Sequence, residues 1–191
     1  MRFIKNTIWK DVFEGWKQRE ADDSGWINCA TNIKGWPNWE SWRKFTATQI
    51  GLNNLTWQIF KFTDPMKEIP DILIGPYGGW QSRVKNKNQG SFNDLLNNPE
   101  QFNFFKKHDK INSMINNFPY PTELIGLIRE DSSKIVCIEG HHRATSIAMA
   151  KKQKISINFK GDITIALAKL EKDRVNILDK ALERGTSKNP K

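Results

Sequence analysis

The sequence contains few cysteines and no long apolar segment. Its 191 residues include two cysteines, Cys29 and Cys137, which are too few for a disulfide framework, so reduced thiols are expected. No run approaches the roughly 18–20 apolar residues that span a bilayer, and no membrane partner is expected. Residues 1–6 lack the apolar core of a signal peptide. Together these absences predict a cytoplasmic protein.

Histidine is also scarce, which limits the possible metal sites. The chain has three histidines, His108, His141 and His142. The two adjacent histidines would point in different directions on a helix. Their rings and the thiol of Cys137 are therefore poorly placed to bind one metal ion. A zinc site is therefore not expected.

Positive charge, by contrast, is abundant. The 30 Lys and Arg residues outnumber the 21 Asp and Glu residues, for a formal net charge of +9. This balance favours anionic partners, here nucleotides, phosphorylated small molecules or nucleic acid. Much of the surplus lies in Lys151, Lys152, Lys154 and residues 184–191, where it is also typical of solvated chain ends.

Apolar residues make up 38% of the chain and eight residues are tryptophan, which predicts a folded protein with a single domain over residues 1–191. Periodicity, turn residues and capping residues predict the order of elements. Helices are expected over residues 7–20, 37–52, two segments between 91 and 117, 140–153 and 171–184, the last stopped by Gly185. Strands are expected over residues 57–62, a short segment from 69, 122–129, 134–138, 155–159 and 163–167. This order predicts an α/β (α+β) fold with a small mixed sheet.

The most specific segment is residues 135–149, which indicates a buried strand, a glycine turn and the start of a helix. A helix start offers free backbone N–H groups and a partial positive charge, and Gly140 permits close approach of a phosphate. Arg143 can bind two phosphate oxygens, and Thr145 and Ser146 add hydroxyls. The segment therefore predicts a phosphate site over residues 140–146.

Glu139-Gly140-His141-His142-Arg143 resembles the Gly-x-His-Arg signature of the ParB/sulfiredoxin-like superfamily. The resemblance covers about residues 69–170 and implies a sheet of that type with a helical insertion over 81–118. Residues 1–62 then form a Trp-rich helical extension with one strand, and residues 171–191 a helix with a basic tail.

The resemblance also implies roles for the signature residues. Arg143 and His142 are expected to contact nucleotide phosphates, with His141 beside them, and to act catalytically by stabilising the charge that develops during phosphoryl transfer. His141 stands where sulfiredoxin-like proteins carry their nucleophilic cysteine, so reduction of cysteine sulfinic acid is not expected. Cys137 does not replace that nucleophile, because a thiol on a buried strand is usually inert.

Glu139 has two interpretations. Its carboxylate, next to a phosphate site, can hold Mg²⁺ or act as a general base. It can equally accept backbone N–H bonds at the helix start. Residues 75–80 also have two interpretations. Tyr77, Gly78 and Trp80 can contact a nucleotide, or they can form a tight aromatic turn. The glutamate that serine kinases of this superfamily carry after the proline is missing after Pro76, which argues against amino-acid kinase activity.

The tryptophans at 36, 39 and 42 can stack on bases, but their helical spacing favours a core role. The sequence predicts a nucleotide-binding protein, an ATP- or CTP-dependent phosphotransferase or NTPase with Mg²⁺, acting on an acceptor that is not identified. Two alternatives stay open: a nucleic-acid-binding module and a non-catalytic regulator switched by nucleotide. The chain shows no helix-turn-helix segment, which argues against the first of these.

Overall fold

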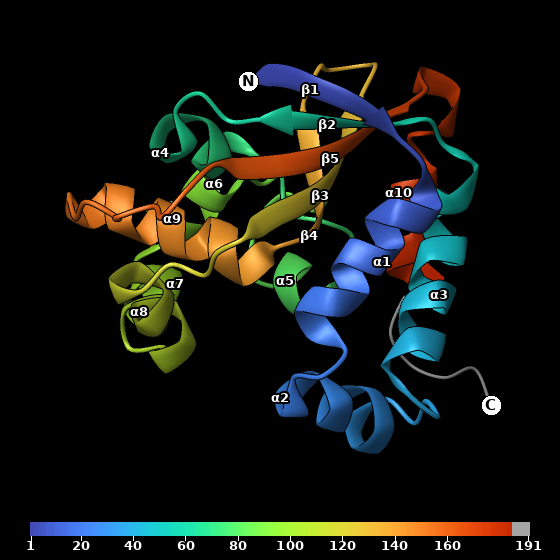
Figure 1. Ribbon diagram of the computed structural model, residues 1–191. Helices are drawn as coiled ribbons and strands as arrows, with labels where there is room; N and C mark the ends of the chain where they lie inside the picture. The colour runs from blue at the N-terminus through green and yellow to red at the C-terminus, as the bar shows by residue number, and fades with distance from the viewer. Residues whose placement is uncertain (185–191) are drawn as a thin grey trace.

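The computed structural model of the protein describes residues 1–184, and its strands there form one five-stranded sheet in the order β1-β2-β5-β3-β4 (Figure 1). β3 and β5 are parallel, and the other neighbouring strands are antiparallel. The strands are β1 (Arg2–Thr7), β2 (Trp57–Lys61), β3 (Thr122–Arg129), β4 (Ile135–Glu139) and β5 (Ile163–Leu170). The mixed sheet with its many helices confirms the predicted fold class.

Helices surround this sheet. The N-terminal ones are α1 (Trp9–Glu20), α2 (Ser24–Asn28), the π-helix η1 (Cys29–Ile33), α3 (Trp39–Ile50) and the 3-10 turn η2 (Leu52–Asn54). The middle of the chain forms α4 (Pro65–Glu68), η3 (Ile69–Asp71), α5 (Gly78–Gln81), α6 (Phe92–Asn97), α7 (Pro99–Lys106) and α8 (Asp109–Asn116). The last are α9 (His141–Gln153), η4 (Lys172–Arg174) and α10 (Ile177–Arg184). Over the described residues, none of these helices has the length and apolar character needed to cross a membrane.

Each face of the sheet is covered by its own set of helices (Figure 1). On one face, α1, α3 and α10 pack through residues such as Trp16, Ile50 and Leu178 against Val136 and Ile138 of β4. On the other face, α6–α9 pack against Leu124, Cys137 and Ile165. Alternating side chains of β4 thus enter two separate cores, as the pleat of a strand requires. The signature helix α9 therefore covers one face of the sheet, and the Trp-rich helices α1 and α3 cover the other.

Three predictions of local structure are wrong. Residues 69–71 form the 3-10 turn η3 instead of a strand, because Pro70 lacks an N–H for a ladder and suits the first turn of a helix. Only Leu73 pairs beyond it, in isolated bridges to Ser91 and Val136. Residues 155–159 follow a left-handed Lys154 and stay largely exposed, without a partner strand. The expected helix over 171–184 begins at Ile177, after the short turn η4, and its predicted stop at Gly185 lies outside the described residues.

Candidate functional site

The start of α9 opens onto a cavity of about 510 Å³. Its walls come from the ends of α1 and α3, from α2 and η1, from the loop at residues 77–80, and from α8 with the segment that follows it. A volume in the range of a few hundred cubic ångströms is typical of small-molecule sites. The structure brings most of the predicted site residues to this cavity: Tyr77, Gly78, Trp80, Glu139, Gly140, His141, His142 and Arg143.

Gly140 shapes the start of α9. Its φ of 105° lies in the left-handed region, and a Cβ added there would lie 2.8 Å from Cγ of Leu124. Only glycine fits both conditions. Gly140 offers no side chain to cap the helix, and within residues 1–184 the backbone N–H groups of His141, His142 and Arg143 have no acceptor. The helix start is therefore a set of free donors beside the cavity.

His141 is held as a neutral ring. The backbone N–H of Gly75 donates to its Nε2 at 3.1 Å, so the ring proton sits on Nδ1, 3.6 Å from Sγ of Cys137. Burial, with smaller contributions from the neighbouring His142 and from Arg43, lowers the pKa of His141 to about 3. Because both ring nitrogens are occupied, its contribution to an anion site is its backbone N–H.

His142 has more freedom. Its ring lies 5.2 Å from the ring of Trp80 and 6.2 Å from that of Trp26, and within the described part of the chain no hydrogen bond involves its ring nitrogens. Burial lowers its pKa to about 4, with smaller contributions from Lys110 and His108. Near neutral pH this ring is therefore uncharged and can both donate and accept one hydrogen bond.

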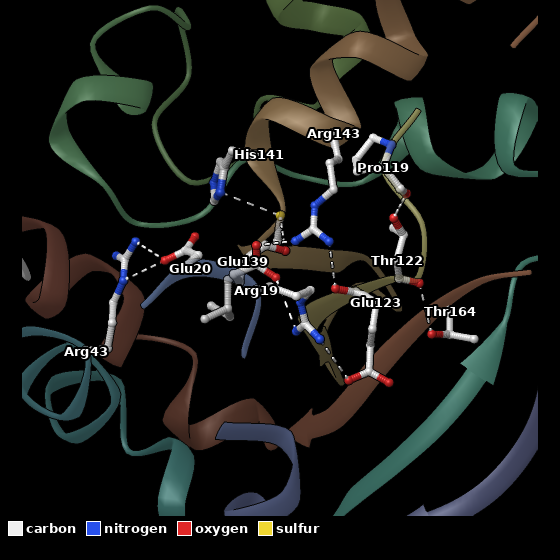
Figure 2. Close-up of polar contacts among 12 residues, drawn as sticks. Arg19, Glu20, Arg43, Pro119, Thr122, Glu123, Glu139, His141, Arg143 and Thr164 are labelled. Atoms are coloured by element: carbon white, nitrogen blue, oxygen red, sulfur yellow. Dashed lines mark hydrogen bonds and ion pairs between the residues drawn. The ribbon is translucent and has the colours of Figure 1, made fainter. Parts of the chain in front are cut away.

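Glu139 lies between two arginines (Figure 2). Oε1 accepts a hydrogen bond from Nη2 of Arg143, and Oε2 lies 3.6 Å from Nη2 of Arg19. Nη1 of Arg143 also donates to the backbone oxygen of Glu123 at 3.2 Å. The Glu139 side chain is only 6% exposed. Arg143 thus forms a buried salt bridge with Glu139.

Arg19 is the second cation of this network. Nη1 lies 3.9 Å from a carboxylate oxygen of Glu123, and burial lowers the pKa of Arg19. Burial likewise raises the pKa of Glu123. Glu139 therefore faces Arg143 from α9 and Arg19 from α1. Both the segment 69–170 and the N-terminal extension thus contribute to this network.

The aromatic residues of the predicted loop have defined contacts. The hydroxyl of Tyr77 donates to the backbone oxygen of Ile138 at 2.8 Å, and burial raises its pKa. The ring of Trp80 stacks on that of Phe105 at 5.7 Å and lies 5.1 Å from the ring of His141. These contacts fit the interpretation as a packed aromatic turn, and both residues also present a surface to the cavity.

Thr145 and Ser146 are not brought to the cavity. Both are fully buried, and their hydroxyls donate back to backbone oxygens one turn earlier: Thr145 to His141, and Ser146 to His142 and Arg143. Hydroxyls bonded in this way serve the helix itself. The structure therefore gives them no part in a phosphate site, although their place in the first turns of the helix suggested one.

Several wall residues were missed by the sequence analysis. Positive side chains on the walls are Arg19, Lys34, Arg43, Lys110 and Arg143, and negative ones are Glu20, Asp23 and Glu139. Five cations against three carboxylates leave a surplus of two positive charges, which favours an anion. A signal existed in the helical spacing: Glu20 lies four residues after the core residue Trp16, and Arg43 lies four after Trp39, so both charges fall on buried faces.

The tryptophans of the N-terminal segment are mainly core. Trp39 is 3% exposed and Trp42 4% exposed, and Trp36 packs partly buried against the same cluster. Trp42 and Trp26 also contribute to the cavity wall. The predicted core role is confirmed for Trp39 and Trp42, and Trp42 also lies on the cavity wall.

Glu139 is not arranged as a magnesium ligand. A cation at its carboxylate would lie beside Arg143 and Arg19, whose charges repel it. Over residues 1–184, no cluster of three or more His, Cys, Asp or Glu side chains is placed to hold a metal ion. The residues present thus do not suit a protein-bound Mg²⁺.

Comparison of the chain with protein-family models, with curated proteins and with solved structures finds no match. The resemblance to the ParB/sulfiredoxin-like signature therefore stays a prediction.

Proposed function

We propose that this protein binds a nucleotide in the cavity, with the phosphates at the start of α9. The observation that carries the proposal is the set of three free backbone N–H groups, of His141, His142 and Arg143, on a wall that also carries surplus positive charge. Free helix-start donors and nearby cations together form the usual environment of a bound phosphate.

The cations of the wall can reach such a ligand. A guanidinium has five N–H groups, and the described hydrogen bonds of Arg143 use two of its nitrogens, so it can keep Glu139 and still donate to a phosphate oxygen. Nζ of Lys110 lies 5.1 Å from the ring of Trp26 and forms no ion pair within the described residues. Its charge is free to pair with an anion in the cavity.

The same cavity suits the base and ribose. Tryptophan rings at positions 26, 42 and 80 line it, and flat aromatic surfaces stack on bases of any identity. A phosphorylated sugar alone would not use these surfaces. Aromatic walls combined with phosphate donors are the reason for proposing a nucleotide.

Two roles follow from nucleotide binding, and the carboxylates favour one of them. Glu139 is paired with Arg143, Glu20 with Arg43, and Asp23 caps α2, so within residues 1–184 each carboxylate of the wall already accepts a hydrogen bond through one of its oxygens. A phosphotransferase needs a group that positions or deprotonates the acceptor. The arrangement therefore supports a nucleotide-switched regulator first. ATP- or CTP-dependent transfer is the second candidate, with neutral His142 as the group nearest to such a role and Mg²⁺ carried by the phosphates.

We place this function in the cytoplasm, where nucleotides are available. Both cysteines are free thiols, and Cys137 is fully buried, as suits a reducing compartment.

Calorimetric titration with ATP, CTP, GTP and ADP, each with Mg²⁺, tests the proposal. We expect binding of at least one nucleotide, weakened about threefold to tenfold by Lys110→Ala. The matched control is Lys106→Ala, because Lys106 is exposed nearby and does not line the cavity. Absence of binding by all four nucleotides overturns the proposal. Chromatography of the bound nucleotide after incubation separates a switch from an enzyme, since only an enzyme yields product.

A further inference from the structure

The ion pair of Arg43 and Glu20 lies on the cavity wall, and the proposed phosphate site does not use it. Glu20 ends α1 and Arg43 lies in α3, and their exposed fractions are 7% and 6%. In Figure 2 the pair lies to the left of Glu139, and Arg143 lies to its right. A buried pair gains little stability over apolar residues of the same volume, so its presence beside a cavity suggests recognition.

The hydrogen bonds of this pair are one-sided. Nε and Nη2 of Arg43 donate to the same oxygen, Oε2 of Glu20, at 3.1 and 2.7 Å. Nε1 of Trp39 donates to that oxygen as well, at 2.9 Å. Within residues 1–184, Oε1 of Glu20 accepts no hydrogen bond and Nη1 of Arg43 donates none. Figure 2 shows the second carboxylate oxygen turned away from Arg43.

Oε1 of Glu20 is therefore an acceptor without a protein partner, on a residue that is more than nine-tenths buried and lines the cavity. A carboxylate oxygen that a ligand shields from water needs a donor. A ligand that presents an N–H group to Oε1 supplies one.

Aromatic surfaces surround the pair. Cζ of Arg43 lies 3.8 Å from the ring centre of Trp42 and 5.0 Å from that of Trp26, and both tryptophans line the cavity. A flat ligand group suits an aromatic wall, and the edge of a nucleotide base can carry the N–H donor that Oε1 of Glu20 needs.

We propose that Glu20, held in place by Arg43, selects a base that carries an exocyclic amino group. The amino N–H donates to Oε1 of Glu20. A base with an oxo group at the same ring carbon turns an acceptor toward the carboxylate, and its free lone pairs repel. This inference rests on the proposed nucleotide function and adds the chemical class of the base and the residue that selects it.

Two nucleotide pairs that differ by amino against oxo at one ring carbon test the inference: ATP with inosine triphosphate, and CTP with UTP. Titrated into the full chain, the amino member of at least one pair should bind about tenfold more tightly or better. Equal affinity within both pairs, or preference for the oxo members, overturns the inference and leaves nucleotide binding intact. No binding by any of the four overturns the proposed function, and the inference falls with it.

The variant Glu20→Gln tests whether Glu20 is the residue that selects the base. Its amide oxygen can accept from Arg43 while its NH₂ faces the ligand, so the preference should disappear or turn toward the oxo base. The matched control is Glu14→Gln, at an exposed position of the same helix, which should keep the wild-type preference. Persistence of an amino preference in folded Glu20→Gln, as judged by circular dichroism, contradicts the role of Glu20. The wild-type comparison is independent of how this variant folds.

Discussion

The backbone N–H of Gly75 donates a 3.1 Å hydrogen bond to Nε2 of His141, which fixes the imidazole as a buried neutral ring at the start of α9. This contact joins the loop before α5 to the helix that carries the free donors. A proton on Nε2 would break it. The position of the loop therefore depends on the protonation state of one histidine.

Stability should fall as the pH falls, because of this ring. The pKa of His141 is about 3 in the folded protein and 6.5 ordinarily, so the unfolded chain binds the proton first as pH decreases. The free energy of unfolding should drop by about 2 kcal/mol for this group between pH 7 and pH 5. Urea unfolding of the wild type and of His141→Gln at both pH values measures it, since glutamine can still accept from Gly75. An equal drop in both proteins contradicts the neutral ring.

Gly140→Ala should destabilise the protein by about 2 kcal/mol or more, because the added Cβ lies 2.8 Å from Leu124 at a backbone φ of 105°. Gly79→Ala is the matched control, since a Cβ there meets nothing within 4 Å. Denaturant midpoints compare the two. Equal midpoints for both variants would show that the turn at Gly140 relaxes without cost.

Breaking the buried pair of Arg143 and Glu139 should cost about 3–5 kcal/mol of stability, because Arg143→Ala leaves a nearly buried carboxylate without its closest partner. The chain contains an exposed pair with the same spacing of four residues, Lys44 and Glu40. Lys44→Ala should change stability little, since exposed pairs are screened by water. Thermal melts of both variants test this contrast, and similar melting temperatures would contradict the burial of the Arg143 pair.

The two cysteines should react differently with an alkylating reagent. Cys29 is half-buried on the cavity wall, whereas Cys137 is fully buried and burial raises its pKa. Only the thiolate reacts, so native protein should be labelled at Cys29 and not at Cys137. Mass spectrometry of labelled peptides measures both sites. Bound nucleotide should slow labelling of Cys29, and rapid labelling of Cys137 would show that the core opens.

The local pattern was enough to predict the elements around the signature. The apolar run before Gly140 and the glycine turn predicted β4 and α9, and the helical spacing of Trp16 and its neighbours predicted α1. β1 was missed because residues 2–6 of this strand are exposed, so it lacks the apolar alternation of a half-buried strand. Its place at the sheet edge is set by pairing with β2, a contact distant in the sequence.

The candidate site was only half predictable for a similar reason. Gly140, His142 and Arg143 stand next to one another in the sequence, so one motif identified them. Arg19 and Arg43 reach the same cavity from α1 and α3, far earlier in the chain. The helical spacing places the charge of Arg43 on a buried face, but only the packing of α1 and α3 on the sheet shows what the two arginines face.

The most direct test of the account is to follow the backbone amides of His141, His142 and Arg143 by NMR during nucleotide titration. If phosphate binds at the start of α9, these three amides should show the largest shifts, and nucleoside without phosphate should not reproduce them. Binding that leaves all three unchanged while shifting amides elsewhere would contradict the phosphate site on which the proposed function depends.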